Sequence, residues 1–561
     1  MEMDRRTFLI GGVGVAGALA LGGLGACATE EDEATPGPAA QRPTLRLPAD
    51  DAGFPSPFAY MRGPGYVKAS LIYDTLMWKD TSGRLHPWLA ESFQASDDGR
   101  SYTFRLRDAR WHDGQPVTAE DVAFTFAYFR SQTIPPQVII QPHPEIAEVR
   151  ATDPRTVEFS LANPLATFLK GYDGVGAVPI VPRHIWSSIP RAAAETNPAV
   201  LVGSGPYRLE SYSRGEGTYL YNAHDGFYLG RPFASRLEYR PVGDDLAGVT
   251  AGEVNIASAT GVVPAVLDPF RSNPDLTVME GPPGNSGNGL WWNLARGGAL
   301  ADVRFRHACA RAIDRQDLVQ RLHGGNAEPG NPGWVPRANP FHVPVEQYPF
   351  DRGAAEALLD SAGYRRMAGQ DLRQGPDGQP LRFTLLVAQP VLPVTDLVVR
   401  ALRTIGVEAT PQALDTPAFN QRLNSGNTEL SIISFGGMNT DHGNGGYLRQ
   451  VYSSKAPRTV QRAQGYVNPE VDRLCDEQDR AVDESRRKEI VARIQRLVAQ
   501  DLPLLPLVYP DIFSVYDRRA FDQWAYTQGG VGSTVPSVEN KQLFLTGRKT
   551  GLEIRPVRQG S

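Results

Sequence analysis

Cysteine is scarce in this sequence, which has three such residues, Cys27, Cys309 and Cys475, in 561 positions. A chain of this length can bury a core large enough to be stable without covalent links, so a disulfide-dense scaffold is excluded. Cys309 and Cys475 each lie in a stretch of helical character, and we expect both to be buried free thiols. A disulfide between these two distant residues is the alternative.

Neither sign of charge dominates, because 57 Lys and Arg residues are balanced by 62 Asp and Glu residues. No basic stripe is present, which argues against nucleic acid as a partner. Past residue 27 no apolar run is long enough to span a membrane. With 41% hydrophobic residues, the composition indicates a large globular protein of two to four domains.

Catalytic and cofactor motifs are also missing. The nine histidines form no His-Glu-x-x-His motif, and the chain has no Cys-x-x-Cys pair, Walker loop or Gly-x-Ser-x-Gly elbow. His112-Asp113 has the composition of a catalytic dyad, but Asp113-Gly114 is a strong turn signal and we favour a turn. The sequence therefore predicts no catalytic residue, no metal site and no cofactor.

The first 27 residues indicate export. Arg5-Arg6 precede a weakly apolar run that ends in Leu24-Gly-Ala-Cys27. The segment resembles a twin-arginine signal with a lipobox, which implies a lipid on Cys27 and an extracytoplasmic location, in the periplasm or on the outer face of the cytoplasmic membrane. Residues 28–42 are acidic, then rich in Pro and Ala, and read as a flexible tether.

Two other interpretations of this segment fit its sequence less well. A membrane-spanning helix needs about 20 predominantly apolar residues, and the run after Arg6 is short and rich in Gly and Ala. Residues 12–17 match the glycine fingerprint of dinucleotide-binding folds. That fingerprint has meaning between a strand and a helix, whereas here it leads into the tether. We therefore favour a cleaved signal.

Periodicity in the rest of the chain predicts a mixture of strands and helices. Residues 101–107 alternate apolar and polar side chains as a half-buried strand does. Thr118 starts a capped helix, with Asp121 at its third position and Val122 and Phe126 on one face. Residues 351–363 and 489–500 predict two more helices, the first stopped by Gly363, and residues 502–508 predict a strand.

An ordered set of motifs carries a family resemblance. The motifs are Tyr73-Asp-Thr-Leu, Leu85-His-Pro-Trp-Leu-Ala-Glu, Asp98-Gly-Arg-Ser-Tyr-Thr-Phe, Trp111-His-Asp-Gly-Gln-Pro-Val-Thr-Ala-Glu-Asp-Val, Gly203-Ser-Gly-Pro-Tyr, Trp292-Asn, Asp302-Val-Arg-Phe-Arg, Ala312-Ile-Asp-Arg, Tyr348 to Tyr364, Asn468-Pro-Glu-Val-Asp and Asp501-Leu-Pro. Together they span nearly all of residues 43–545. The chain thus resembles the family 5 extracytoplasmic solute-binding proteins, the dipeptide, oligopeptide and nickel receptors of ABC importers.

Most of these motifs are interpreted as structural. Asp98-Gly99 is expected to form a hairpin turn, and Trp111 to pack in a core. Gly203 and Gly205 are expected to supply unusual backbone angles. The features that identify the family therefore mostly lie away from the ligand.

The resemblance implies an α/β fold: a periplasmic-binding-protein-like, two-lobed clamshell of type II, similar to cluster C, with an extra inserted domain. Ligand is expected in the cleft between domains I and III, enclosed by hinge closure with crossings near Asn293 and Tyr509. The implied boundaries are residues 43–69, 202–294 and 510–561 for a discontinuous domain I, 70–201 for domain II and 295–509 for domain III.

Three segments are implied to line that cleft. The first supplies Phe54 and Tyr60, and the second supplies Trp292 and Asn293. Trp291 and Trp292 are neighbours in a strand and should point to opposite faces; we favour Trp292 for the cleft. The third segment supplies the residues that follow the strand at 430–433, namely Phe435, Gly436, Met438, Asn439 and Asp441.

The third segment bears on specificity. In peptide-binding members it reads Trp-x-x-Asp-x-x-(Asp/Glu)-Pro, and the first Asp pairs with the α-ammonium of the peptide. Here Phe435 stands for the Trp, Met438 for that Asp, Asp441 for the second acid and His442 for the Pro. A buried ammonium needs a charged partner. Either Asp441 supplies it, or the ligand is a solute without a free amine; core packing is the other role for Met438.

The resulting functional hypothesis is a lipid-anchored, monomeric receptor that captures a peptide or peptide-like solute for ABC permease subunits. Two alternatives are a cofactor-containing enzyme exported by the twin-arginine route and a sensory receptor on the same fold.

Overall fold

The structure is a computed structural model that describes residues 42–60, 64–79, 84–135, 138, 140–169, 171, 174–281, 286–366, 369–388, 392–436, 445–456, 462–522 and 524–525. The chain divides into two units, Met1–Gln41 and Arg42–Ser561, and every described residue belongs to the second. Within these ranges no helix combines the length and the apolar character that crossing a bilayer would require.

Two sheets are built from segments far apart in the sequence. The first has the order β1-β10-β9-β8 and the second β11-β21-β12. Their strands are β1 (Thr44–Pro48), β8 (Tyr207–Ser213), β9 (Thr218–Ala223), β10 (Arg236–Arg240), β11 (Ile256–Thr260), β12 (Leu276–Gly281) and β21 (Ile512–Asp517), accompanied by the helices α1 (Pro64–Ile72), α4 (Asp245–Thr250) and α5 (Pro264–Arg271). The late strand β21 pairs with both β11 and β12, so the chain returns here near its end.

A third sheet, β4-β5-β7-β6, and the β2–β3 hairpin come from residues 77–161. The elements are β2 (Met77–Lys79), β3 (Leu85–Pro87), β4 (Ala90–Ala95), β5 (Ser101–Leu106), β6 (Ile146–Asp153), β7 (Thr156–Leu161), α2 (Ala119–Ser131), α3 (Arg183–Trp186) and the 3-10 turns η1 (Ala192–Ala194) and η2 (Pro198–Val200). Gly99, at φ 66°, turns β4 into β5 as predicted. The cap of α2 is confirmed, because Thr118 donates its backbone N–H and its hydroxyl to Asp121 at 2.8 and 2.9 Å.

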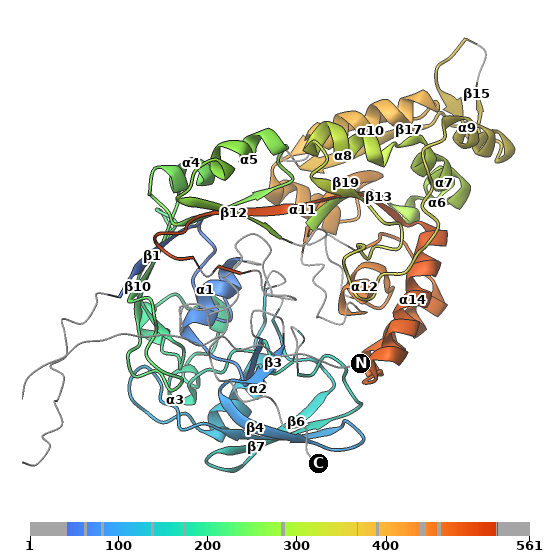
Figure 1. Cartoon of the computed structure of the whole chain (residues 1–561). Helices are drawn as coiled ribbons and strands as arrows, with labels where there is room; N and C mark the ends of the chain where they lie inside the picture. The colour runs from blue at the N-terminus through green and yellow to red at the C-terminus, as the bar shows by residue number, and fades with distance from the viewer. Residues whose placement is uncertain are drawn as a thin grey trace, which may run out of the picture. The chain divides into compact units, whose positions relative to one another are not determined.

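The largest sheet has six strands in the order β14-β20-β13-β19-β17-β18. The strands are β13 (Ser286–Trp292), β14 (Ala327–Pro329), β17 (Arg382–Ala388), β18 (Glu408–Leu414), β19 (Leu430–Gly436) and β20 (Leu504–Pro510), with a small β15 (Arg365–Arg366) and β16 (Arg373–Gln374) pair beside it. The helices are η3 (Leu294–Arg296), α6 (Gly298–Ala301), α7 (Val303–Ala312), α8 (Arg315–His323), α9 (Arg352–Ser361), α10 (Leu392–Thr404), α11 (Thr416–Asn424), α12 (Gly445–Tyr452), α13 (Pro469–Arg480) and α14 (Glu484–Asp501). They cover both faces of the sheet (Figure 1).

The two faces follow from the twofold period of the strands. Leu385 and Val387 pack with α7 to α10, whereas Leu386 between them packs with α11 to α14. Both remaining cysteines are free and buried, as predicted, one in each of these two cores. Burial raises the pKa of Cys475 to about 12, so this thiol stays protonated and inert.

The predicted helices exist, with one shifted boundary. α9 ends before Gly363, which adopts φ 87° as a C-terminal stop should. The helix predicted from residue 489 begins at Glu484, because Asp483 accepts the N–H of Arg486 at 2.7 Å and caps it. The predicted strand over 502–508 is β20 at 504–510.

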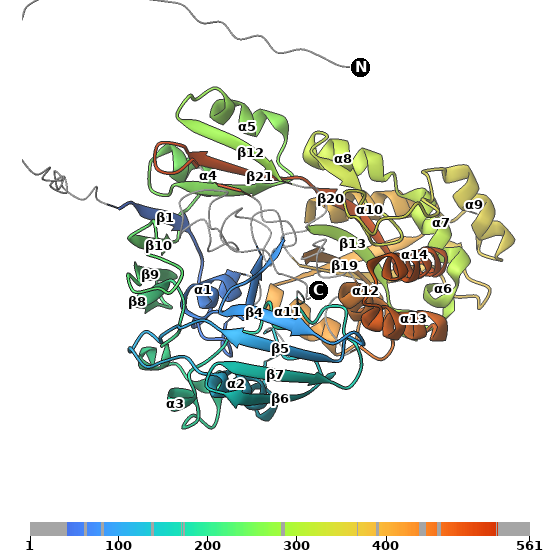
Figure 2. The same cartoon turned by 60° about the horizontal axis from the view of Figure 1, so that its bottom comes forward.

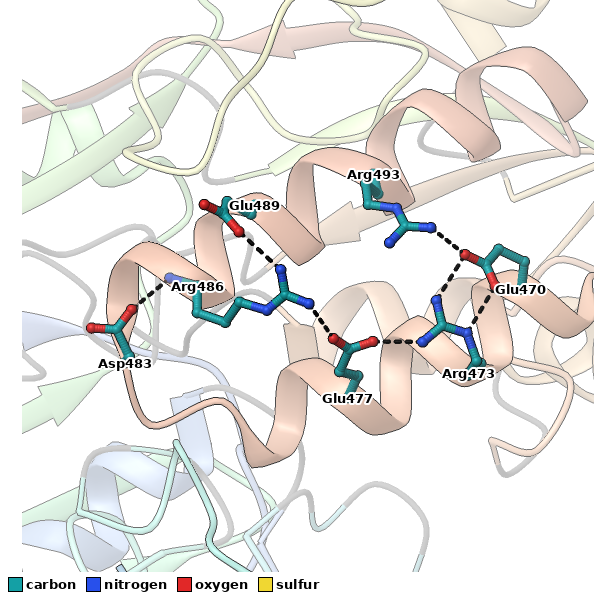
Figure 3. A network of polar contacts seen from close by, with 7 residues as sticks. All are labelled: Glu470, Arg473, Glu477, Asp483, Arg486, Glu489 and Arg493. Atoms are coloured by element: carbon teal, nitrogen blue, oxygen red, sulfur yellow. Dashed lines mark hydrogen bonds and ion pairs between the residues drawn. The ribbon is translucent and has the colours of Figure 1, made fainter. Parts of the chain in front are cut away.

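A network of exposed ion pairs joins helices α13 and α14 (Figure 3). Glu477 of α13 accepts from Arg473 of its own helix and from Arg486 of α14, both at 2.6 Å. At the other end of the network, Glu470 of α13 forms an ion pair with Arg493 of α14 at 2.6 Å. Each such pair contributes little because its members are solvated, but the network fixes how the two helices are paired.

Several family motifs meet at one buried carboxylate. Asp74 accepts hydrogen bonds from Trp88 Nε1 at 2.9 Å, from Ser204 Oγ at 3.2 Å and from Tyr228 OH at 3.0 Å. Trp111 is 1% exposed in the same core, which confirms its predicted packing role. These motifs therefore hold the β2–β3 region against the strands that follow residue 203.

The prediction for Gly203 was wrong in its physical reason. Neither Gly203 nor Gly205 has a positive φ. Instead the backbone of α1 passes so close that a Cβ on Gly203 would lie 1.9 Å from Ile72 O, and one on Gly205 would lie 2.5 Å from Leu71 O. Glycine is required here for close backbone approach.

Candidate ligand-binding site

The chain crosses twice between the three-stranded and the six-stranded sheet. One crossing lies between Gly281 at the end of β12 and Ser286 at the start of β13, and the other at Asp511 between β20 and β21 (Figure 2). The second lies next to Tyr509, and the role of both crossings as a hinge stays a prediction. The first lies before Asn293, because β13, which ends at Trp292, is already a strand of the six-stranded sheet. We therefore place the proposed boundary of domain III before Ser286.

Side chains and backbone groups reinforce the crossing at Asp511. Asp511 O accepts the N–H of Gly261 at 2.7 Å, and its own N–H donates to Asn326 O at 3.1 Å. His323 Nδ1 lies 2.5 Å from Gly261 O, and Asn326 Nδ2 donates to Val262 O at 2.7 Å. The segment after β11 is thereby tied to α8 and β14 of the six-stranded sheet.

The segment that carries Phe54 and Tyr60 is fixed at its start by tyrosines of β8 and β9. Tyr212 OH donates to Asp51 Oδ1 at 2.7 Å, and Tyr219 OH donates to Gly53 O at 2.8 Å. A bridge between Gly53 and Tyr60 closes the segment into a loop. The predicted first segment is thus a pinned loop on the first sheet.

Phe54 and Tyr60 are both buried in the core of this region. Phe54 is 6% exposed and meets Tyr212 edge to face at 6.2 Å between ring centroids. Tyr60 is fully buried, and burial raises the pKa of its hydroxyl. The backbone of Ile140 partly offsets this rise, and the hydroxyl has no other hydrogen-bond partner among the described residues.

Trp291 and Trp292 point to opposite faces of β13, as the strand period predicts. Trp292 is 1% exposed and packs with Leu290 in the core beneath α7 and α10. Trp291 lies on the other face, with ring centroids 5.9 Å from Trp334 and 5.8 Å from Phe435. Both indoles are buried, so the ligand role of Trp292 stays a prediction, and Trp291, which contacts Phe435, is the alternative for it.

Alternate glycines in β13 make room for these rings. A Cβ on Gly287 would lie 2.6 Å from Phe435 Cζ, and a Cβ on Gly289 would lie 2.5 Å from Trp291 Cζ3. The rings therefore lie directly against the strand backbone. The period-two glycines of Ser286-Gly-Asn-Gly were the signal for this arrangement, and sequence reasoning did not use it.

Phe435 lies in an aromatic group that sequence reasoning missed, made of Trp291, Trp334, Phe435, Tyr452 and Tyr509. The Phe435 and Trp334 ring centroids are 4.4 Å apart. Trp334 has φ 74°, which is rare for a bulky residue. Tyr509 OH donates a hydrogen bond to the carbonyl oxygen of Trp334 at 2.8 Å. Trp334 Nε1 and Tyr452 OH are buried and have no hydrogen-bond partner among the described residues. Such orphaned donors are uncommon and suit contact with a ligand.

The rest of the predicted third segment is only partly described. Gly436 ends β19 and pairs with Ser286 of β13. Met438, Asn439 and Asp441 lie outside the described residues, as does Cys27. The predictions about the ammonium partner and the lipid anchor therefore stay predictions.

Asn293 has a structural role in the fold. It is 4% exposed, and its Nδ2 donates to Gly426 O at 3.0 Å and to Thr428 O at 2.9 Å. Its Oδ1 accepts the N–H of Ala295 at 3.2 Å and caps η3. Asn293 borders a cavity of about 300 Å³ between residues 423–426 and 462–467, but its amide is committed to the protein.

The histidine near the turn at 112–114 does not form a dyad with its neighbour. Asp113 Oδ2 lies 2.7 Å from Nε2 of His184 instead. His112 Nδ1 accepts from Gly203 N at 3.3 Å and Nε2 donates to Gly205 O at 2.9 Å. Burial lowers the pKa of His112 to about 3, so it stays neutral and serves as a structural link.

Helix α1 carries a buried lysine, Lys68. Lys68 is 3% exposed and its ammonium lies 4.1 Å from the Tyr239 ring centroid. Burial lowers the pKa of Lys68 to about 7.

Within the part of the chain that the structure describes, no three His, Cys, Asp or Glu side chains gather as a metal site would require.

Known proteins are similar to this chain in sequence and in fold. A putative ABC transporter peptide-binding protein of Brucella ovis is 28% identical over 371 residues, which cover 63% of this chain and 64% of that protein. The oligopeptide-binding protein AppA of Bacillus subtilis, solved with a nonapeptide, superposes with a TM-score of 0.69 at 21% identity and covers 85% of this chain and 95% of its own. NikA of Brucella suis, solved with Fe(III)-EDTA, gives a TM-score of 0.75 at 20% identity, covering 89% and 99%.

These structural likenesses confirm the predicted two-lobed α/β fold of periplasmic binding proteins. The model of the bacterial extracellular solute-binding proteins, family 5, matches residues 84–456, well over half of the chain. That match covers the quoted motifs from Leu85 to Tyr364. The chain belongs to the family 5 bacterial extracellular solute-binding proteins.

Proposed function

We propose that this protein is the substrate-binding lipoprotein of an ABC importer and has no catalytic activity of its own. It captures a peptide or peptide-like solute between its two lobes and delivers it to membrane permease subunits as a monomer. The observation that carries the proposal is the family match, together with relatives named as peptide-binding proteins of ABC transporters.

The proposed ligand contacts combine the pinned loop at Phe54 and Tyr60 with the aromatic group around Phe435. Trp291 and Trp334 contribute aromatic rings, and Trp334 Nε1 is a buried donor without a hydrogen-bond partner among the described residues. Gly436, Met438, Asn439 and Asp441 complete the proposed set. Aromatic walls with few polar groups are typical of small-molecule sites.

Ligand identity is tested first by mass spectrometry of solute released from the denatured protein. The released compound, free dipeptides and their N-acetylated forms are then compared by calorimetry. With Met438 in place of an ammonium partner, free dipeptides are expected to bind about tenfold to a hundredfold more weakly than in receptors with that partner. Tight binding of free dipeptides that acetylation abolishes would instead assign the amine to Asp441.

A pair of matched substitutions tests the aromatic site. Trp334→Phe removes an unpartnered Nε1 but keeps a ring, and is expected to weaken binding of the released ligand. Trp111→Phe removes another unpartnered buried Nε1 far from the proposed site in sequence and is expected to leave affinity unchanged. Equal affinities for both variants would remove Trp334 from the site.

Closure around the ligand follows from the two crossings at 281–286 and at Asp511, since few residues absorb the rotation. Small-angle scattering is expected to give a smaller radius of gyration with saturating ligand. An unchanged radius with the released compound bound would contradict closure while leaving the binding role intact.

A further inference from the structure

A second cavity, distinct from the proposed ligand site, lies where β17 and β19 begin. Its volume is about 210 Å³, and its lining includes Arg296, Arg422, Glu429, Thr384 and Gln412. Phe435 lies six residues further along β19, which corresponds to about 20 Å at 3.3 Å per residue. The cavity is smaller than the pockets that hold drug-sized ligands, so it suits a small molecule.

Two guanidinium groups are held over this cavity by one turn. Arg296 donates from Nε to Thr428 O at 3.0 Å and from Nη2 to Asn427 Oδ1 at 2.7 Å. Arg422 donates from Nε to Asn427 O at 3.2 Å. The turn itself is fixed, because Asn293 holds the carbonyls of Gly426 and Thr428. Both arginines are therefore positioned by neutral acceptors.

These two guanidinium groups form no ion pair among the described residues. Among the described residues, neither Arg296 nor Arg422 comes within ion-pair distance of a carboxylate, whereas nearby Arg382 pairs with Glu408 at 2.6 Å. Arg296 Nη1 and both terminal nitrogens of Arg422 have no protein acceptor in the same part of the chain. Planar guanidinium forks of this kind match carboxylates in geometry and charge.

Glu429 sets the sign and size of the ligand charge. One of its oxygens, Oε2, accepts the N–H of Thr384 at 2.7 Å, and the other accepts no hydrogen bond from the described residues. Two arginines and one glutamate leave a net charge of +1 in the cavity, which favours one negative charge over the two of a phosphate. The free carboxylate oxygen suits a hydroxyl or amine beside the carboxylate of the ligand.

We propose that this cavity is a second binding site, specific for a small monocarboxylate that carries a neighbouring donor group, such as a hydroxy acid or an amino acid. The site belongs to the six-stranded region alone and does not depend on the ligand captured between the lobes. Experiments can therefore refute the proposed importer function and the proposed carboxylate site independently of each other.

Calorimetry of the whole protein with lactate, acetate and inorganic phosphate at constant ionic strength tests the proposal. Lactate is expected to bind most tightly, with a dissociation constant of about 1 mM or below, as two charge-assisted contacts allow. Arg422→Gln should weaken lactate at least about tenfold, and Arg382→Gln should have no effect. Glu429→Gln, which keeps an acceptor for Thr384, should abolish the advantage of lactate over acetate and strengthen phosphate.

Absence of lactate binding at millimolar concentrations would overturn the proposal, as would equal loss in the Arg382→Gln variant. If Arg422→Gln does not fold, Arg422→Lys provides the same test, because lysine keeps the charge without the fork. Unchanged lactate affinity in that variant would also refute the assignment.

Discussion

The buried carboxylate of Asp74 offers a quantitative test of how the family motifs stabilise the fold. Tyr228 OH donates to Asp74 Oδ2 at 3.0 Å, and the same oxygen accepts from Ser204 Oγ at 3.2 Å. Removing the hydroxyl with Tyr228→Phe deletes one hydrogen bond to a charged group without a large change in shape. Such bonds contribute about 1.5–3 kcal/mol.

The full perturbation is larger because Asp74→Ala leaves three donors without their acceptor. Trp88 and Ser204 are fully buried, and each orphaned donor costs about 1–3 kcal/mol. We expect Asp74→Ala to lower the free energy of unfolding by about 3–5 kcal/mol, near the upper range for single substitutions.

A double-mutant cycle isolates the contact. Urea denaturation followed by tryptophan fluorescence, applied to Asp74→Ala, Tyr228→Phe and the double variant, should give a coupling energy of about 1.5–3 kcal/mol. Asp98→Ala, an exposed acid of the β4–β5 turn, is the control and should couple with Tyr228→Phe by less than about 0.5 kcal/mol. A coupling near zero between Asp74 and Tyr228 would refute the network as a source of stability.

Three further predictions concern backbone contact, pH and localisation. Gly203→Ala should sharply reduce the folded yield, because its Cβ would lie 1.9 Å from Ile72 O, whereas Gly215→Ala, with open space around it, should express normally; equal yields would contradict the close-approach argument. Because the pKa of His112 is about 3 in the fold and about 6.5 when unfolded, the unfolded chain binds the extra proton, so stability should fall with a slope of up to about 1.4 kcal/mol per pH unit as pH drops below 6.5. Denaturation at several pH values should show a weaker slope for His112→Gln, and identical slopes would rule out His112 as the source. Finally, Cys27→Ala should release the protein from membranes on fractionation, and unchanged fractionation would rule out the lipobox.

Local sequence signals were sufficient for the helices and the turn that the sequence analysis predicted. The cap at Thr118, the stop at Gly363 and the turn at Gly99 depend on residues a few positions apart, so the sequence carries all the information they need. The ordered motifs likewise identified the family without any coordinates.

Only the tertiary structure decided what distant residues do together. Strand periodicity placed Trp291 and Trp292 on opposite faces, but which face meets Phe435 depends on the pairing of β13 with β19. Gly203 has an ordinary backbone conformation, and its need for glycine comes from α1, more than a hundred residues earlier. Arg296 and Arg422 share a cavity because the turn at 427–428 accepts from both. Such contacts depend on how non-local segments pack, and no local pattern in the sequence encodes them.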